Sequence, residues 1–327
     1  MIKKILLVLT VTIFSFVNGF AQNPDFALSQ AEKDSLLKNY NQIFPFWGRN
    51  VIEKGFDIPY PVGVNANYIY MDQGILIDNL GLSFGDNPTV PMGDFIKFGD
   101  NRTVINSVNA RFDLWVFPFL NLYGMIGEGW SSTTVNLTDP IGLKTTVDQK
   151  GVYYGFGATT AVGYKKTWIS FDGNVSWTDL EKLEDPVQVF VGGIRVGQTF
   201  RVMKTHRLAI WAGAMYQKFD TGTQGSVKLS EVLPGTIHDK INNIPNQPGF
   251  DELPDRVKDA ILGIIDDYNN RYDNAKLNYS IDKGPETPWN LLFGANYEFT
   301  KAWQLRAEAG LIGRWSLLIN LNYRFAL

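Results

Sequence analysis

The chain has few side chains suited to acid–base or nucleophilic chemistry. Its 327 residues include two histidines, His206 and His238, and no cysteine. Neither histidine stands in a recognisable catalytic motif, because no G-x-S-x-G elbow and no His-x-x-x-His metal spacing occurs. We therefore expect no catalysis, no cofactor and no metal, and keep a lipid hydrolase only as a third functional hypothesis.

A second group of candidate residues is charged and occupies alternate positions of strand-like segments. By that alternation they all point to one face: Arg111, Asp113, Arg195, Arg201, Arg207, Glu298, Arg306, Glu308 and Arg324. If this face lines a narrow interior, opposite charges would pair and fill it. The alternative is a selectivity lining for a polar or anionic solute, which the excess of arginine slightly favours.

The segments that must position these charges are clearest at the end of the chain. Three alternating runs, 289–299, 303–312 and 315–325, follow one another with turns of two or three residues. A period of two predicts strands. Runs of roughly ten residues suit a tilted membrane crossing, whereas ordinary strands average about five or six residues. We therefore favour an all-β transmembrane barrel over a soluble sandwich.

The same reading extends to an antiparallel up-and-down barrel of ten strands. The predicted strands are 62–70, 103–117, 119–131, 151–164, 166–178, 187–201, 205–218, 289–299, 303–312 and 315–325. Tight turns at Pro118, Lys165, Lys204 and Lys301 alternate with longer connections at 72–102, 131–150, 178–186 and 218–288. If residues 75–84 hold further strands, the count becomes twelve. The small face of Gly151–Tyr164 leaves room for bulky groups across the lumen.

The start of the chain predicts export. Lys3 and Lys4 precede an apolar run over 5–17, and small residues follow, which predicts a signal peptide over 1–21 with a cut after Ala21. Residues 22–60 form a predicted periplasmic segment with one helix, for which Ser29 and Glu32 have the spacing of a capping box. Residues 61–327 are the predicted barrel.

The long connection 218–288 contains a predicted amphipathic helix. Its apolar stripe consists of Leu253, Val257, Ile261, Ile264, Ile265 and Tyr268. Such a stripe must be buried, either on the loop and barrel rim or in the role of a lid, plug or binding surface.

Composition excludes some classes of function. A formal net charge of −3 offers no electrostatic case for nucleic acid. No downstream run of eighteen apolar residues occurs, so a membrane-bound chain would cross the bilayer by strands.

With its signal peptide, alternating segments, turn asymmetry and closing strand WSLLINLNYRF, the chain resembles Gram-negative outer-membrane β-barrel proteins. Ala326 and Leu327 follow the terminal aromatic Phe325. The resemblance implies outer-membrane lipid and the barrel-assembly machinery as partners, with 218–288 outside the cell. The first functional hypothesis is a small channel or transporter for polar solutes. The second is a non-conducting binding or structural barrel that acts through 218–288.

Overall fold

The computed structural model describes most of the chain downstream of residue 27. The described residues are 28–38, 40–84, 89–140, 142–164, 166–181, 183–203, 206–219, 222–233 and 235–327. The predicted signal peptide and its cut after Ala21 lie outside them.

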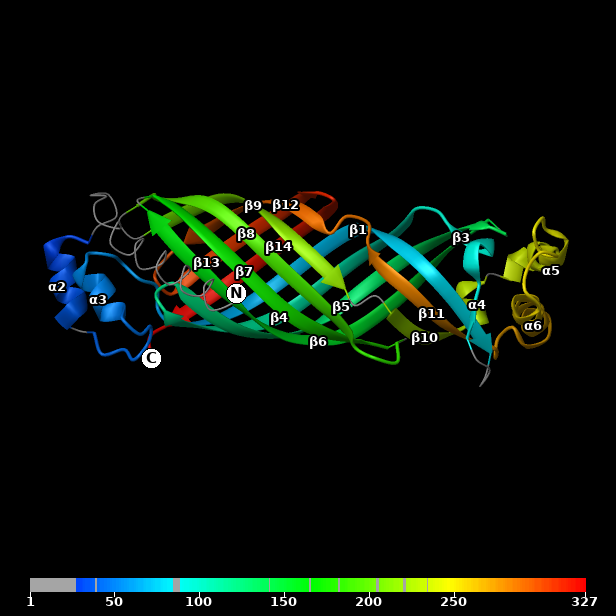
Figure 1. The fold of residues 1–327 in the computed structure, drawn as a ribbon. Coiled ribbons are helices and arrows are strands. Elements are labelled where there is room, and N and C mark those ends of the chain that lie inside the picture. Colours follow the sequence, from blue (N-terminus) through cyan, green and yellow to red (C-terminus); the bar gives the residue numbers. More distant parts are fainter. Residues whose placement is uncertain are drawn as a thin grey trace, which may run out of the picture.

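Ten antiparallel strands close into a barrel (Figure 1). In ring order they are β1 (Val62–Phe84), β4 (Asn101–Phe117), β5 (Leu120–Asp139), β6 (Leu143–Tyr164), β7 (Thr167–Leu180), β8 (Val187–Arg201), β9 (Arg207–Phe219), β12 (Trp289–Glu298), β13 (Trp303–Ile312) and β14 (Arg314–Phe325). The pairing of β1 with β14, from Val62 opposite Phe325 to Gln73 opposite Arg314, completes the ring. The ten-stranded transmembrane barrel predicted from the sequence is confirmed.

The alternative of twelve strands is wrong, because residues 75–84 belong to β1, which has an irregularity between Asp78 and Gly81 but does not end there. The prediction of a polar loop over 131–150 is also wrong. There β5 runs on to Asp139 and β6 starts at Leu143, and the two strands pair from Leu137 opposite Leu143 downward. Strand-forming threonine and valine alternate through both segments, and interspersed Asp and Lys made them look like a loop.

The connection 218–288 also contains strands. A hairpin of β10 (Gly222–Lys228) and β11 (Lys276–Pro285) lies within it. β11 pairs with β1 from Ile75 to Phe84, along the edge that β14 occupies as far as Gln73. The wall of the barrel is thus extended beyond the tops of β12, β13 and β14. Two short strands, β2 (Val90–Pro91) and β3 (Lys97–Phe98), add to the same extension.

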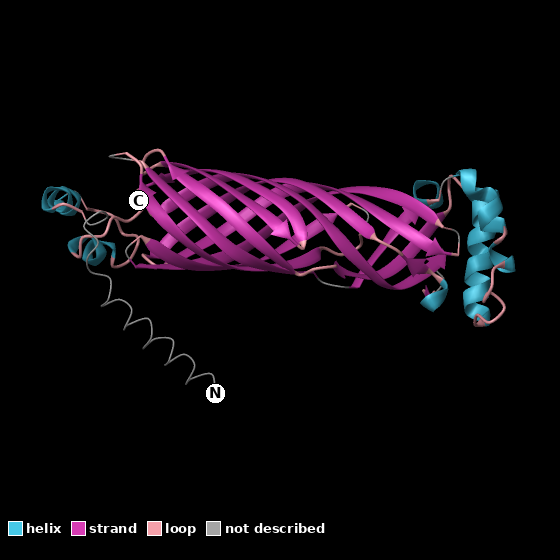
Figure 2. Cartoon of the chain, turned by 90° about the horizontal axis from the view of Figure 1, so that it is seen from above, coloured by secondary structure: helices cyan, strands magenta, loops and turns pink. Residues whose placement is uncertain are grey.

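The two ends of the barrel differ (Figures 1 and 2). The terminal end carries residues 28–61 and Leu327, together with the short connections 118–119, 165–166, 202–206 and 299–302. The helices between β10 and β11 and the far ends of β1, β5 and β6 lie at the cap end, whereas the turn at Gly313 lies part-way along the barrel, where the β10–β11 hairpin continues the wall. Gly313 has a φ of 88°, a left-handed backbone conformation that lets a single residue reverse the chain.

The outer surface changes character along the barrel axis. In the terminal half it is apolar: Phe156 on β6 is 62% exposed, and Phe112, Ile126, Phe293 and Leu321 are similarly exposed. In the cap half the same strands present polar pairs outward, such as Arg102 with Asp72 and Thr134 with Thr146. An apolar surface that encircles a closed barrel is suited to lipid, so the terminal half is the membrane band.

Two helices lie at the terminal end, α2 (Gln30–Lys38) and α3 (Gly48–Glu53). The predicted capping box is present, since the Ser29 amide and hydroxyl both donate to Glu32 Oε2, at 2.8 and 2.7 Å. These hydrogen bonds hold the pKa of Glu32 below its usual range. No helix among the described residues is both long and apolar enough to span a membrane.

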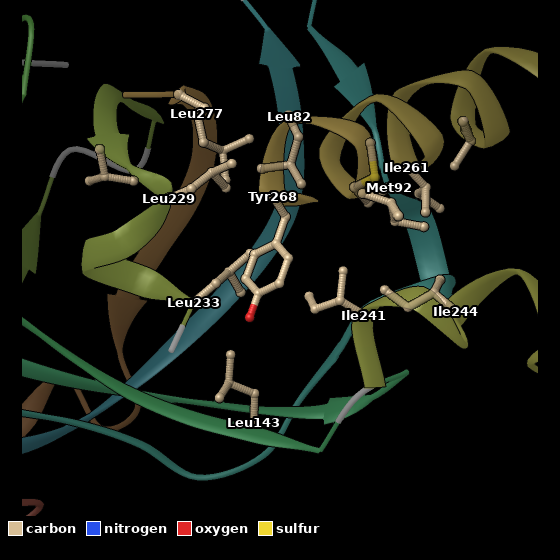
Figure 3. Packing of buried hydrophobic residues seen from close by; sticks show 14 of the residues in the cluster. Leu82, Met92, Leu143, Leu229, Leu233, Ile241, Ile244, Ile261, Tyr268 and Leu277 are labelled. Atoms are coloured by element: carbon tan, nitrogen blue, oxygen red, sulfur yellow. The ribbon is translucent and has the colours of Figure 1, made fainter. Parts of the chain in front are cut away.

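The cap consists of the helices between β10 and β11. They are α4 (Leu229–Val232), η2 (Gly235–Ile237), α5 (His238–Asn242), η3 (Ile244–Asn246) and α6 (Asp255–Arg271), preceded in the chain by η1 (Gly93–Phe95) after β2. The predicted amphipathic helix is α6, which buries Val257, Ile261, Ile265 and Tyr268, with Leu253 and Ile264 packed against the same cluster. The cluster joins the cap to the barrel rim through Leu82, Met92 and Leu143 (Figure 3).

Candidate functional site

The candidate site is the barrel interior, a cavity of about 900 Å³. Its lining starts near Asp113 and Arg324 at the terminal end and continues to Ile241 and Ile261 of the cap. Because alternate residues of each strand point inward, all ten strands contribute to it. The lining is polar and charged in the terminal half and mainly apolar in the cap half.

One cluster of predicted lumen residues centres on Glu308 of β13. Arg195 of β8 donates to it through Nε and Nη2, at 2.7 and 2.8 Å, and Arg306 donates through Nη2 at 2.9 Å. Trp211 donates its indole N–H to the same carboxylate at 2.6 Å. Arg195 is also paired with Asp172 of β7. Every oxygen of Glu308 is therefore engaged by a donor, and the cluster ties β7, β8, β9 and β13 together across the lumen.

A second cluster centres on Asp113 of β4. It accepts hydrogen bonds from Arg324 at 2.8 Å and from Asn121 and Asn65 at 2.7 Å each. Arg111 lies 3.6 Å from the centroid of the Tyr123 ring and donates to Asn121. We refer to the two clusters together as the ion-pair floor, which comprises Arg111, Asp113, Asp172, Arg195, Arg306, Glu308 and Arg324.

The carboxylates and arginines of the ion-pair floor form a network in which they contact one another. Its carboxylates, Asp113, Asp172 and Glu308, each contact an arginine, and Asp113 and Glu308 are 5–6% exposed. A passing solute would have to compete with these buried partners. The arrangement matches the structural interpretation of the lumen charges more closely than the selectivity interpretation.

The remaining predicted lumen residues lie at the terminal mouth. Arg207 and Lys301 both pair with Asp57, which belongs to the segment before β1. Arg324 also donates to the carbonyl oxygens of Tyr60 and Pro61, at 2.8 and 3.1 Å. The segment 57–61 is thereby tied to the wall at this mouth. Glu298 stands opposite Arg207 in the ladder, and Arg201 is exposed at the hairpin end.

The small face of β6 leaves room for a large side chain, Tyr123, which comes from the adjacent strand β5 and not, as the sequence predicts, from across the lumen. A Cβ at Gly157 would lie 2.5 Å from the Tyr123 ring. Tyr123 can therefore lie flat against the wall while its other face receives Arg111.

The cap half of the cavity is here called the outer chamber. Its apolar lining residues, contributed by strands and by the cap, are Ile75, Ile77, Leu80, Leu82, Ile105, Val135, Leu137, Val147, Val189, Ile241, Ile244, Ile261, Leu277 and Ile281. Thr103, Thr133, Thr145 and Gln149 interrupt this lining. The α6 stripe forms the core of the cap, and two of its residues, Ile261 and Ile264, also line the chamber and roof it.

The two histidines lie at opposite ends of the molecule. His206 lies at the terminal end, where its Nδ1 is 2.9 Å from the Tyr297 hydroxyl. His238 is in α5 of the cap, beside Asn242. Among the described residues, no three His, Cys, Asp or Glu side chains are grouped so as to hold a metal.

Sequence reasoning missed several residues of the interior. Asp172 and Asp57 complete ion pairs, and Trp211 donates a hydrogen bond to Glu308. The strands of Asp172 and Trp211 did show the alternation that could have placed both residues inward. The apolar lining of the chamber was missed because β1 was ended at Tyr70 and β11 was not predicted at all.

Comparisons with known proteins give distant likenesses only. No protein-family model and no curated protein matches the chain. The outer membrane protein OprG from Pseudomonas aeruginosa is 8% identical with a TM-score of 0.42, covering 83% of this chain and 100% of its own. The beta domain of the Bordetella autotransporter Brka is 11% identical with a TM-score of 0.39, covering 81% and 100%. The COG4313 outer membrane channel from Pseudomonas putida F1 is 10% identical with a TM-score of 0.32, covering 82% and 97%.

Likenesses at this level carry no argument about activity, and the architectural assignment follows from the ring of strand pairs and the apolar band around it. The architecture is that of a ten-stranded transmembrane antiparallel β-barrel. Within it, an ion-pair floor at the terminal end and a roofed apolar chamber at the cap end set this barrel apart from an open tube.

Proposed function

We propose that the protein is an outer-membrane barrel that binds an apolar small molecule in its outer chamber. The observation that carries the proposal is the inward-facing apolar lining of the cap half, which forms one part of an interior cavity of about 900 Å³ in total. Ligand pockets typically have volumes of about 300–1,000 Å³ and mainly apolar walls with a few polar groups. This proposal develops the second functional hypothesis, in which residues 218–288 act in binding.

The wall of the chamber supports a binding role because its polar face is turned outward. On β6, Val147 and Thr145 line the cavity while Asp148 and Lys150 are exposed. The inner wall of a water-filled pore is expected to carry polar side chains, whereas the inner wall of the chamber carries isoleucine and valine.

The binding test uses the uncharged apolar fluorophore N-phenyl-1-naphthylamine with the full chain in lipid nanodiscs. We expect a saturable fluorescence increase, absent from empty nanodiscs, at one probe per barrel. Val147→Trp fills part of the chamber and should weaken binding about tenfold or more. Thr146→Trp, the adjacent residue on the outer face, is the matched control and should leave binding unchanged. Fluorescence equal to that of empty nanodiscs would refute the proposal.

A channel for polar solutes stays a prediction, supported by the polar lining of the terminal half. Its test is conductance in planar bilayers, with the intact chain and with residues 222–285 deleted. Unitary current only in the shortened chain would indicate a pore gated by the cap. The absence of current from both forms would refute the channel hypothesis and leave binding as the proposed function of the barrel.

A further inference from the structure

Two cations of the chamber form no salt bridge with any residue that the structure describes, and they contrast with the paired arginines of the floor. Lys283 of β11 lines the cavity together with Leu277, Tyr279 and Ile281, which share its inward parity. Arg314 begins β14 on the same inner side and is 3% exposed. Within the described part of the chain, neither cation forms a salt bridge with a carboxylate, and the side-chain partners found for Arg314 are neutral oxygens.

Arg314 is held in place by neutral oxygens. Its Nη1 donates to Gln73 at 3.1 Å and also to Gln217, and its Nη2 donates to the Pro288 carbonyl at 3.0 Å. Its Nε and the Gln73 Nε2 are buried and find no acceptor within the described part of the chain. Buried donors without acceptors are unfavourable, so their persistence indicates that an acceptor belongs there.

The carboxylates near these cations in the sequence face the other way. Asp78 and Glu286 are exposed on the outer side of the wall, and Asp282 accepts a hydrogen bond from Asn79 there. The acidic residues that do line the cavity are Asp113, Asp172 and Glu308, all engaged by arginines of the floor. The chamber therefore offers N–H donors and positive charge inside an apolar wall.

The register places the two cations on one strip of the wall. Arg314 stands opposite Gln73, and Lys283 stands opposite Ile77, on the same inward face of β1. Ile77 lies four positions after Gln73, which corresponds to about 13 Å along the strand. Long side chains from both positions can approach a head group bound between them.

We infer that the ligand of the outer chamber is an apolar carboxylic acid, whose head group binds between Lys283 and the Gln73–Arg314 pair. This inference rests on the proposed binding function and names its ligand class. A carboxylate supplies two acceptor oxygens. The donors available to them are the Lys283 ammonium, Arg314 Nε and Gln73 Nε2. The hydrocarbon part lies against Ile75, Ile77 and Ile281 under the cap.

The test is competition against N-phenyl-1-naphthylamine in nanodiscs that hold the full chain. Dodecanoate should displace the probe at a concentration about tenfold or more below that of 1-dodecanol, since charge-assisted hydrogen bonds are lost with the alcohol. Lys283→Met should raise the dodecanoate requirement about 10- to 100-fold, to the level of dodecanol, and leave probe binding unchanged. Lys283→Arg should keep the preference for the acid.

Lys276→Met is the matched control, because Lys276 is an exposed lysine at the start of the same strand. It should change neither measurement. Equal competition by dodecanoate and dodecanol, or an unchanged preference in Lys283→Met, would overturn the inference while the binding function stands. Tighter competition by dodecyl phosphate than by dodecanoate would overturn the carboxylate assignment. Failure of the wild-type chain to bind the probe would instead refute the proposed function itself.

Discussion

The strands β1, β5 and β6 run through both the terminal and the cap halves of the barrel, yet their inner and outer faces are chemically opposite in the two halves. On β6, Phe156 faces outward and Gly157 inward in the membrane band, whereas Asp148 faces outward and Val147 inward beyond it. The alternation itself continues unbroken between them. The environment on each side of the wall, lipid or water, therefore selects which face carries the apolar residues.

The largest effect should come from breaking the ion-pair floor. Glu308→Ala leaves Arg195 and Arg306 without their shared carboxylate in a buried site. Removing one partner of a buried pair costs about 3–5 kcal/mol, so the free energy of unfolding should fall by that amount. Urea unfolding in lipid vesicles measures it.

Glu181→Ala is the control in the cap half, since Glu181 pairs with Lys150 at 3.2 Å on the exposed surface. Exposed pairs contribute about 0–1 kcal/mol. Comparable losses for Glu181→Ala and Glu308→Ala would mean that the floor is no more structural than a surface contact.

An intermediate effect should mark the limit of the membrane band. Phe156→Arg introduces a charge on the lipid-facing side of β6 and should cost about 2–4 kcal/mol of unfolding free energy. Thr146→Arg lies on the same strand and the same face in the cap half, where a charge should cost about 0–1 kcal/mol. Equal costs at both positions in vesicles would place lipid along the whole outer surface.

The smallest effect should appear in the cap. Ile261 lies in the roof of the chamber and is 4% exposed. Ile261→Val should lower the local stability of the cap by about 1 kcal/mol. Native-state hydrogen exchange of residues 229–272 reports this directly. Leu262, its neighbour on α6, is 46% exposed, and Leu262→Val should leave exchange nearly unchanged. Faster exchange throughout the barrel strands would show that cap and wall unfold as one unit.

Much of the barrel could be predicted because its membrane band imposes one simple pattern. Alternation with aromatic ends defined every crossing strand, and the parity placed Arg195, Glu308 and Arg324 on the inner face. The α6 stripe was equally readable, because a helix that buries one face repeats its apolar residues at a fixed spacing.

The cap half could not be predicted in the same way, because its wall faces water outside and an apolar cavity inside. Polar residues such as Asp148 and Lys150 then suggested a loop, although they belong to a paired strand. Lys283 was missed for a different reason. Its strand joins β1 across some two hundred residues of sequence, and only the pairing shows that the lysine faces the chamber.

The shared edge of β1 has a consequence for the order of assembly. β14 pairs with the first part of that edge and β11 with the remainder, so the two meet end to end at the seam between the first and last strands. Joining strands so distant in sequence is a slow, late event in folding. We expect the hairpin to dock only after the seam has closed, which makes the chamber the last part of the molecule to form. A chain that stalls before closure would carry all its transmembrane strands and still lack the outer chamber.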